Sequence, residues 1–140
     1  MTAALNRSAG TLILTLDLDG PRPIYLQIYQ QIADAVSGGQ LQVAATLPST
    51  RQLARDLGIN YHTVHRAYDL LVAGGIIAMQ ARHRAVVLPA DSRTITTAWL
   101  TEWSDRIRVL FTEAYTVGMD RADLRRQIDQ LLGESPVSSS

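Results

Sequence analysis

The 140-residue sequence contains no cysteine, no lysine and only one phenylalanine. The absence of cysteine excludes a disulfide framework, a thiolate nucleophile and any zinc or iron–sulfur site held by cysteine. Because lysine is missing, arginine carries all 13 positive charges, and 13 aspartate and glutamate residues balance them to a net charge of zero. A uniformly basic coat for nucleic acid is therefore excluded, whereas a local basic patch is not.

Long hydrophobic runs are also missing. No apolar run approaches the roughly 18 residues that a membrane span requires, and the first ten residues lack the basic and then apolar pattern of a signal peptide. Apolar residues nevertheless make up 46% of the sequence, which is enough to build a hydrophobic core. We therefore expect a soluble, intracellular globular protein.

The charges divide the chain near residue 90. Residues 1–90 hold seven arginines and five aspartates, whereas residues 91–140 hold six arginines and eight acidic residues. Pro89 ends one apolar run at this point. We expect a first domain over residues 11–90 and a second over residues 91–134. The polar ends, residues 1–10 and 135–140, are expected to be disordered.

Apolar spacing and turn residues predict a helix-turn-helix in the first domain. Residues 11–17 read as a short strand, and residues 24–36 have helical periodicity. Ser49 is a good N-cap for a short helix that ends at Gly58, and Asn60 is a good N-cap for the next helix, which stops at Gly74. Two apolar runs then flank a basic tip at residues 82–84, which predicts a β-hairpin wing.

Helical periodicity also runs through the second domain. We expect one helix over residues 92–117 and a second that begins after Asp120, with Asp123 in a capping-box arrangement, and ends at Gly133. The fold class is therefore mainly α with a small β-hairpin wing: a winged helix-turn-helix domain plus a C-terminal α-helical hairpin. Two such helices cannot bury their apolar faces on each other alone, so a second copy of the chain is the simplest partner. The expected homodimer interface comprises Ile95, Trp99, Trp103, Ile107, Leu110, Phe111, Ala114, Leu124, Ile128 and Leu131.

The outward side of the second helix carries tyrosine, histidine and arginine, which can donate to base edges in the major groove of double-stranded DNA. Hydroxyls and backbone N–H groups at helix starts suit phosphates, and arginines at the wing tip can reach the minor groove or its phosphates. The expected DNA-binding residues are Ser49, Thr50, Arg51, Asn60, Tyr61, His62, Thr63, His65, Arg66, Arg82, His83 and Arg84.

Other interpretations of these residues remain open. His62, His65 and Asp69 share one helix face and are metal-ligand types, but two histidines at this spacing are common by chance, so we expect no metal and no cofactor. Trp99 and Trp103 are aromatic residues of the type that lines small-molecule sites, although such residues more often pack between helices. No catalytic constellation is present, so we do not expect an enzyme.

Four separated motifs occur in order along the first domain: Pro23-Ile24-Tyr25-x-Gln27-Ile28, Leu47-Pro48-Ser49-x-Arg51-x-Leu53-Ala54, Asn60-x-x-Thr63-Val64-x-Arg66-Ala67-Tyr68 and Gly75-Ile76-Ile77. Together they resemble the winged-helix domain of GntR-type bacterial transcription regulators. The short two-helix tail is similar to the dimerisation appendage of the YtrA-type branch. The resemblance implies phosphate or base contacts by Ser49, Arg51, Thr63 and Arg66.

The sequence departs from the family pattern at three places. Tyr61 stands where a basic residue is common, Ala44 replaces a loop glycine, and Arg82-His83-Arg84 replaces the Gly-x-Gly of the wing tip. We expect a cytoplasmic, nucleoid-associated bacterial repressor that binds an inverted-repeat operator as a homodimer. The alternative is a winged-helix protein-interaction module without specific DNA binding. The sequence does not indicate a small-molecule effector.

Overall fold

The computed structural model describes residues 2–5 and 12–134. The chain divides into two compact units, residues 1–100 and 101–140. Most of the disorder expected at the two ends falls outside the described residues, but residues 2–5 form a strand. No helix in the described part of the chain is long and apolar enough to cross a membrane.

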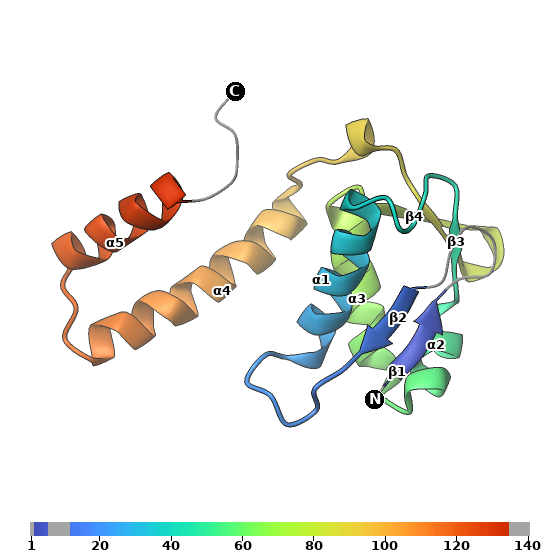
Figure 1. Cartoon of the computed structure of the whole chain (residues 1–140), viewed down its shortest axis with the longest axis horizontal. Coiled ribbons are helices and arrows are strands. Elements are labelled where there is room, and N and C mark those ends of the chain that lie inside the picture. Colours follow the sequence, from blue (N-terminus) through green and yellow to red (C-terminus); the bar gives the residue numbers. More distant parts are fainter. Residues whose placement is uncertain (1, 6–11, 135–140) are drawn as a thin grey trace. The chain divides into compact units, whose positions relative to one another are not determined.

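Unit 1 is a three-helix core with a small antiparallel sheet, as expected (Figure 1). Its helices are α1 (Ile24–Ser37), α2 (Thr50–Leu57) and α3 (Tyr61–Ala73). The sheet order is β3-β5-β4, and these strands are β3 (Thr46–Leu47), β4 (Ile77–Gln80) and β5 (Arg84–Val87). The apolar faces of all three helices meet in one core, which includes Ile28, Ile32, Leu53, Leu57, Val64 and Leu71. The expected wing is confirmed, and β3 adds a third strand that the sequence did not predict.

A second β-hairpin precedes this core. Strand β1 (Thr2–Leu5) pairs antiparallel with β2 (Leu12–Thr15), and β2 is the strand expected over residues 11–17. Two glutamines of α1 bind the backbone around the end of β2. The Gln31 amide exchanges two hydrogen bonds with the backbone of Thr15, at 2.8 and 3.0 Å. The Gln27 amide does the same with Asp17, at 2.8 and 2.9 Å, and these bonds attach the hairpin to α1.

The long helix begins later than the sequence predicts. The short 3₁₀ turn η2 (Ala90–Ser92) comes first, and α4 runs from Thr97 to Thr116. The Thr94 N–H donates to the Gly74 carbonyl (3.1 Å), and the Thr96 hydroxyl donates to the Ala73 carbonyl (2.7 Å). Thr96 then accepts from the Trp99 N–H (3.1 Å) as the N-cap. These bonds keep residues 93–96 extended and include them in unit 1.

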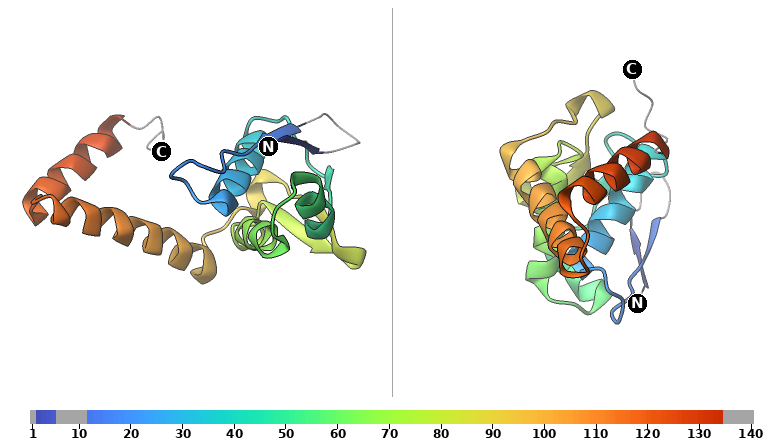
Figure 2. Two further views of the ribbon diagram at one scale, coloured as in Figure 1. Left: turned by 90° about the horizontal axis from the view of Figure 1, so that it is seen from below. Right: turned by 90° about the vertical axis from the view of Figure 1, so that its left-hand side faces the viewer.

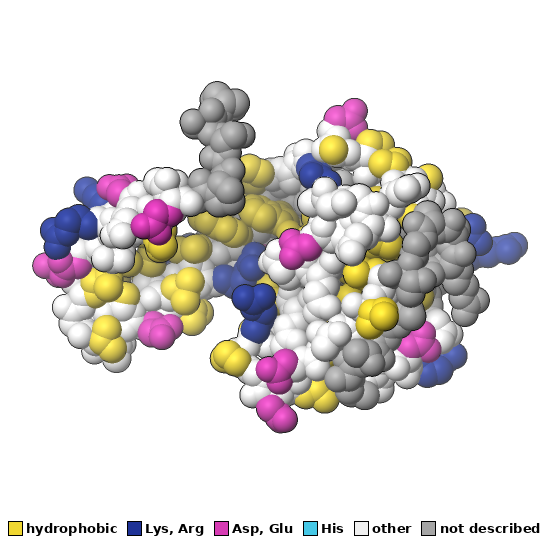
Figure 3. Space-filling view, viewed as in Figure 1, with side chains coloured by type: hydrophobic (Ala, Val, Ile, Leu, Met, Phe, Trp, Pro, Cys, Tyr) yellow, Lys and Arg dark blue, Asp and Glu magenta, His cyan; other side chains and the backbone are white. Residues whose placement is uncertain are grey.

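Unit 2 is an open helical hairpin made by the rest of α4 and by α5 (Arg121–Glu134) (Figure 2). The expected capping box at the start of α5 is confirmed, because the Asp123 N–H donates to Asp120 Oδ1 (2.8 Å) and the Asp120 N–H donates to Asp123 Oδ2 (3.3 Å). Neither helix contains a buried residue. Large apolar side chains therefore remain on the surface of this unit, where Figure 3 shows them gathered along the hairpin.

Candidate nucleic-acid interface

Side-chain caps fix the two helices of the helix-turn-helix. The Ser49 hydroxyl accepts from the Gln52 N–H (3.1 Å), and Asn60 Oδ1 accepts from the His62 N–H (2.8 Å). Between the helices Gly58 adopts the left-handed conformation (φ +67°), which glycine reaches without steric cost. These three residues set where α2 begins, where α2 ends and where α3 begins, as the sequence predicts.

Tyr68 attaches the helix-turn-helix to the domain core, because its ring is buried there. Its hydroxyl donates to the Pro48 carbonyl (2.8 Å), which ties α3 to the residue preceding the α2 cap. Burial raises the pKa of the Tyr68 hydroxyl, so it remains a neutral donor. The hydrogen bond joins the middle of α3 to the segment just before α2.

Helix α3 has a buried side and an exposed side. The buried side consists of Val64, Ala67, Tyr68, Leu70 and Leu71. His62, His65, Arg66 and Asp69 are exposed on the other side, and Tyr61 is half-buried at its beginning. The part of the chain that the structure describes thus leaves the tyrosine, histidine and arginine side of α3 facing solvent, as expected.

Four of the expected DNA-binding residues form one group, here called the Tyr61 cluster (Arg51, Tyr61, His62 and His65). The Arg51 guanidinium lies over the Tyr61 ring, 5.0 Å from its centroid. The rings of His62 and His65 lie 5.4 and 5.5 Å from the same ring. A cation–π contact at an exposed site is worth about 0.5–1 kcal/mol, so Tyr61 restrains an arginine that comes from the neighbouring helix. Tyrosine at this position therefore orients a cation instead of supplying one.

Arg66 lies apart from that cluster. Its guanidinium stacks on the ring of Tyr25, 3.8 Å from the centroid, and Tyr25 is buried in α1. The contact holds the positive charge of Arg66 where α1 and α3 meet. Tyr25 was not among the expected functional residues, because pairing between two helices leaves no local signal in the sequence.

One of the sequence-based assignments changes in the structure. Thr50, an expected DNA contact, is buried at 8% exposure, and its side chain is therefore not available to DNA. The three residues of the metal candidate that the sequence set aside are also located. His65 Nδ1 lies 3.0 Å from Asp69 Oδ2, but no group of three metal-ligand side chains occurs among the residues that the structure describes. His62 therefore does not complete a site with that pair.

The wing turns through η1 (Ala81–His83), and Gln80 pairs with Arg84 across its base. Arg82 adopts a left-handed conformation (φ +64°) at a position where the family pattern has glycine. Arg82 and Arg84 are both exposed, and neither makes an ion pair within the described ranges. Cationic side chains project from this end of unit 1 in Figure 3. The wing tip thus presents the side chains of Arg82 and Arg84 at positions where the family pattern has glycine.

The sequence assigned Trp99 to a dimer interface, but in the structure its side chain makes contacts within unit 1. Its indole N–H donates to the Tyr29 hydroxyl (3.2 Å), and the side chain packs against the hydrophobic core. A Cβ atom added to Gly74 would lie 3.2 Å from Trp99 Cδ1, so the backbone approaches the indole closely there. Trp99 therefore attaches the first turn of α4 to the winged domain.

A helix-turn-helix followed by a β-hairpin wing defines the winged helix-turn-helix class, and here β3 pairs with that hairpin. Residues 24–87 match the family described as "Bacterial regulatory proteins, gntR family". The solved structure of YtrA from Sulfolobus acidocaldarius, a GntR-family transcription factor, is 35% identical, and the match covers 74% of this chain and 97% of that one, with a TM-score of 0.52. The chain belongs to the GntR family, whose members are regulatory proteins and not enzymes.

Two curated relatives show how far the likeness extends. The transcriptional repressor YtrA from Bacillus subtilis is 26% identical over 119 residues, which are 85% of this chain and 92% of that protein. The regulatory protein MocR from Rhizobium meliloti is 34% identical over 84 residues, but these cover 59% of this chain and only 17% of MocR. The chain therefore spans less than a fifth of MocR and nearly the whole of the Bacillus YtrA.

Proposed function

We propose that the protein is a sequence-specific DNA-binding transcription repressor that acts as a homodimer in the bacterial cytoplasm, associated with the nucleoid. The observation that carries the proposal is the exposed Tyr61 cluster, which is built on two capped helices of a winged helix-turn-helix. In this class of fold the second helix of the helix-turn-helix, here α3, enters the major groove with its first turns toward the bases. The Tyr61 cluster lies at that end of α3.

The residues divide by the part of DNA that they would contact. His62 and His65 are exposed on α3 and would bond base edges in the major groove. Arg51, held over Tyr61, would bond a phosphate, and the half-buried Ser49 and Thr63 would add weaker contacts at the helix starts. Arg82 and Arg84 would bind phosphates or the minor groove by their side chains.

The surface of unit 2 supports the homodimer. Trp103 and Leu110 are 43% and 57% exposed and lie seven positions apart on α4, so they share one helix face. A monomer rarely leaves such side chains in water, and a second copy would cover them. Two-fold symmetry would then place two α3 helices in successive major grooves, so the operator would be an inverted repeat with half-sites about 34–36 Å apart.

Selection of binding sites from random duplex DNA tests the proposal. The full chain should enrich one inverted repeat, and fluorescence anisotropy should then give an affinity for that repeat at least 1,000-fold above that for a scrambled duplex. If the dimer neutralises about eight phosphates, log K should fall with log salt at a slope of about −7. Enrichment of no sequence, or equal affinity for both duplexes, would contradict the proposal and favour a protein-interaction module.

A further inference from the structure

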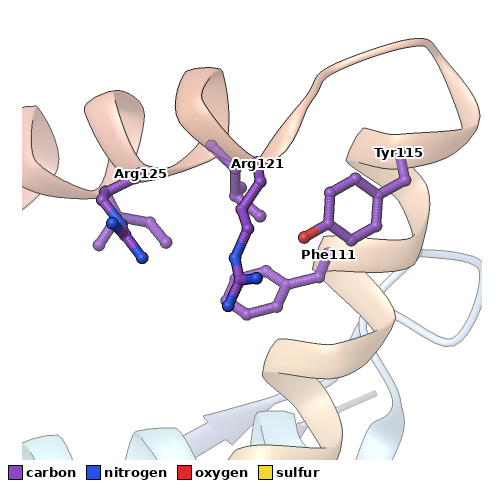
Figure 4. A pocket seen from close by; sticks show the side chains of 6 residues that line it. Phe111, Tyr115, Arg121 and Arg125 are labelled. Carbon is purple, nitrogen blue, oxygen red and sulfur yellow. The ribbon is translucent and has the colours of Figure 1, made fainter.

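The helical hairpin of unit 2 contains a cleft of its own. The cleft measures about 540 Å³ and lies between α4 and α5. Phe111 and Tyr115 line it from α4, and Arg121, Leu124, Arg125 and Ile128 line it from α5. Figure 4 shows the two aromatic rings and the two guanidinium groups pointing into the same space from opposite helices. This volume falls within the range of pockets that bind small molecules.

The charges in the cleft are unbalanced. Two other arginines of unit 2 have carboxylate partners, because Arg108 pairs with Asp105 (2.6 Å) and Arg126 pairs with Asp123. By contrast, Arg121 and Arg125 make no ion pair with any residue that the structure describes, and no acidic residue lines the cleft. The cleft therefore presents two positive charges beside an apolar and aromatic wall.

The acidic residues at the start of α5 do not supply the missing charge. The Asp123 N–H donates to the Asp120 carboxylate and lowers its pKa, so Asp120 serves as the helix cap. Asp123 is engaged with the Asp120 N–H and with Arg126. Both carboxylates are thus engaged with the backbone or with an arginine that does not line the cleft.

We propose that this cleft binds a small aromatic carboxylate. The rings of Phe111 and Tyr115 would pack against a planar aromatic body, with offset or edge-to-face geometry. The guanidinium groups of Arg121 and Arg125, one helical turn apart, would bind the carboxylate through charge-assisted hydrogen bonds. Phe111, Leu124 and Ile128 also belong to the expected dimer interface, so a second copy is the competing occupant of the cleft. Its apolar helix would meet two guanidinium groups that have no acidic partner in the cleft, which disfavours it. The cleft lies wholly within unit 2, so ligand binding can be measured without DNA.

The test compares two probes of the same shape, 2-naphthoate and the neutral 2-naphthamide, by isothermal titration of the full chain. The wild type should bind 2-naphthoate at least tenfold more tightly than 2-naphthamide, the minimum expected of one charge-assisted hydrogen bond. The double variant Arg121→Gln/Arg125→Gln should lose that preference and still bind the amide. The control Arg108→Gln/Arg126→Gln removes two positive charges outside the cleft and should keep the preference for 2-naphthoate.

Two further measurements make the result decisive. The single variant Arg125→Gln should reduce the preference for 2-naphthoate to an intermediate value, and circular dichroism verifies that each variant keeps its helices. Equal binding of both probes to the wild type, or an unchanged preference in the double variant, would overturn the proposal. It would also fail if neither probe bound to the wild type. If the double variant then sedimented as a smaller species, the cleft would belong to a contact between copies.

Discussion

Within the described residues, two that are not glycine adopt the left-handed backbone conformation, Ala44 (φ +70°) and Arg82 (φ +64°). Both stand where the family pattern has glycine. The sequence showed that the glycines were missing, but only the structure shows that Ala44 and Arg82 adopt the left-handed conformation. A left-handed conformation costs a residue with a Cβ atom about 1–2 kcal/mol, so both loops carry strain.

Ala44→Gly should therefore stabilise the protein. The variant removes the left-handed cost but adds entropy to the unfolded chain, which leaves a net gain of about 0.5–1 kcal/mol. Urea unfolding should show a higher midpoint with an unchanged slope. The control is Ala33→Gly in the interior of α1, which should destabilise by about 1 kcal/mol. A lower midpoint for Ala44→Gly would show that the alanine side chain contributes to folding.

Arg51 and Arg55 offer a matched comparison on one helix. Both are exposed on α2, but Arg51 lies over Tyr61, whereas Arg55 donates to Gln52 Oε1 (3.4 Å) within its own helix. Arg51→Ala should weaken binding to all DNA sequences and make the salt slope of log K less steep by about 2, one phosphate contact for each subunit of a dimer. Arg55→Ala should change neither quantity. Equal effects of the two variants in anisotropy titrations would remove the phosphate role of Arg51.

At the scale of elements, the junction between the winged domain and α4 depends on Gly75. Its φ is +69°, and a Cβ atom there would lie 2.0 Å from the Ser92 carbonyl oxygen. Gly39 also has a positive φ (+80°), but nothing lies within 4 Å of its Cβ position. Gly75→Ala should therefore destabilise by about 3 kcal/mol, the sum of backbone strain and overpacking. Gly39→Ala should cost only the backbone term, about 1 kcal/mol.

Urea unfolding of both variants separates the two terms. If residues 90–96 docked only loosely on the winged domain, Ser92 would move away from the new methyl group. Gly75→Ala would then cost no more than Gly39→Ala, and residues 90–96 would not be packed firmly against Gly75.

Elements with local signals were predictable from the sequence, and elements that depend on distant contacts were not. Ser49, Asn60 and Asp120 cap helices through hydrogen bonds two or three residues away, so the local sequence was sufficient to place those starts. Strand β3 has two residues and exists through its pairing with β5, so it has no periodicity of its own. The start of α4 moved from residue 92 to Thr97 because the winged domain binds residues 94 and 96.

The same distinction applies to the candidate site. The exposed side of α3 followed from helical periodicity, since its apolar residues recur every three or four positions. The stacking of Arg66 on Tyr25 and of Arg51 on Tyr61 joins different helices, so spacing along the chain could not indicate it. Thr50 was assigned to DNA by its position at a helix start, but the packing of α2 buries it.

At the scale of the whole molecule, the proposed DNA binding requires that two copies associate through unit 2. The double variant Trp103→Ala/Leu110→Ala removes two large side chains that share one face of α4 and are exposed in a single chain. Sedimentation should change from dimer to monomer, because that face loses two large, exposed apolar side chains. The matched control is Val43→Ala, which trims an equally exposed apolar side chain in a loop of unit 1 and should leave the dimer intact.

Operator affinity should fall together with the dimer. When one half-site is bound, the linked second subunit binds at a high effective concentration, and loss of that linkage should weaken binding about 100-fold or more. Binding to a single half-site should change little, because the helix-turn-helix itself is untouched. A wild-type chain that sedimented as a monomer at micromolar concentration and still bound the inverted repeat tightly would contradict the dimer. The exposed face of α4 would then need a different partner, and the spacing of the operator would no longer follow from symmetry.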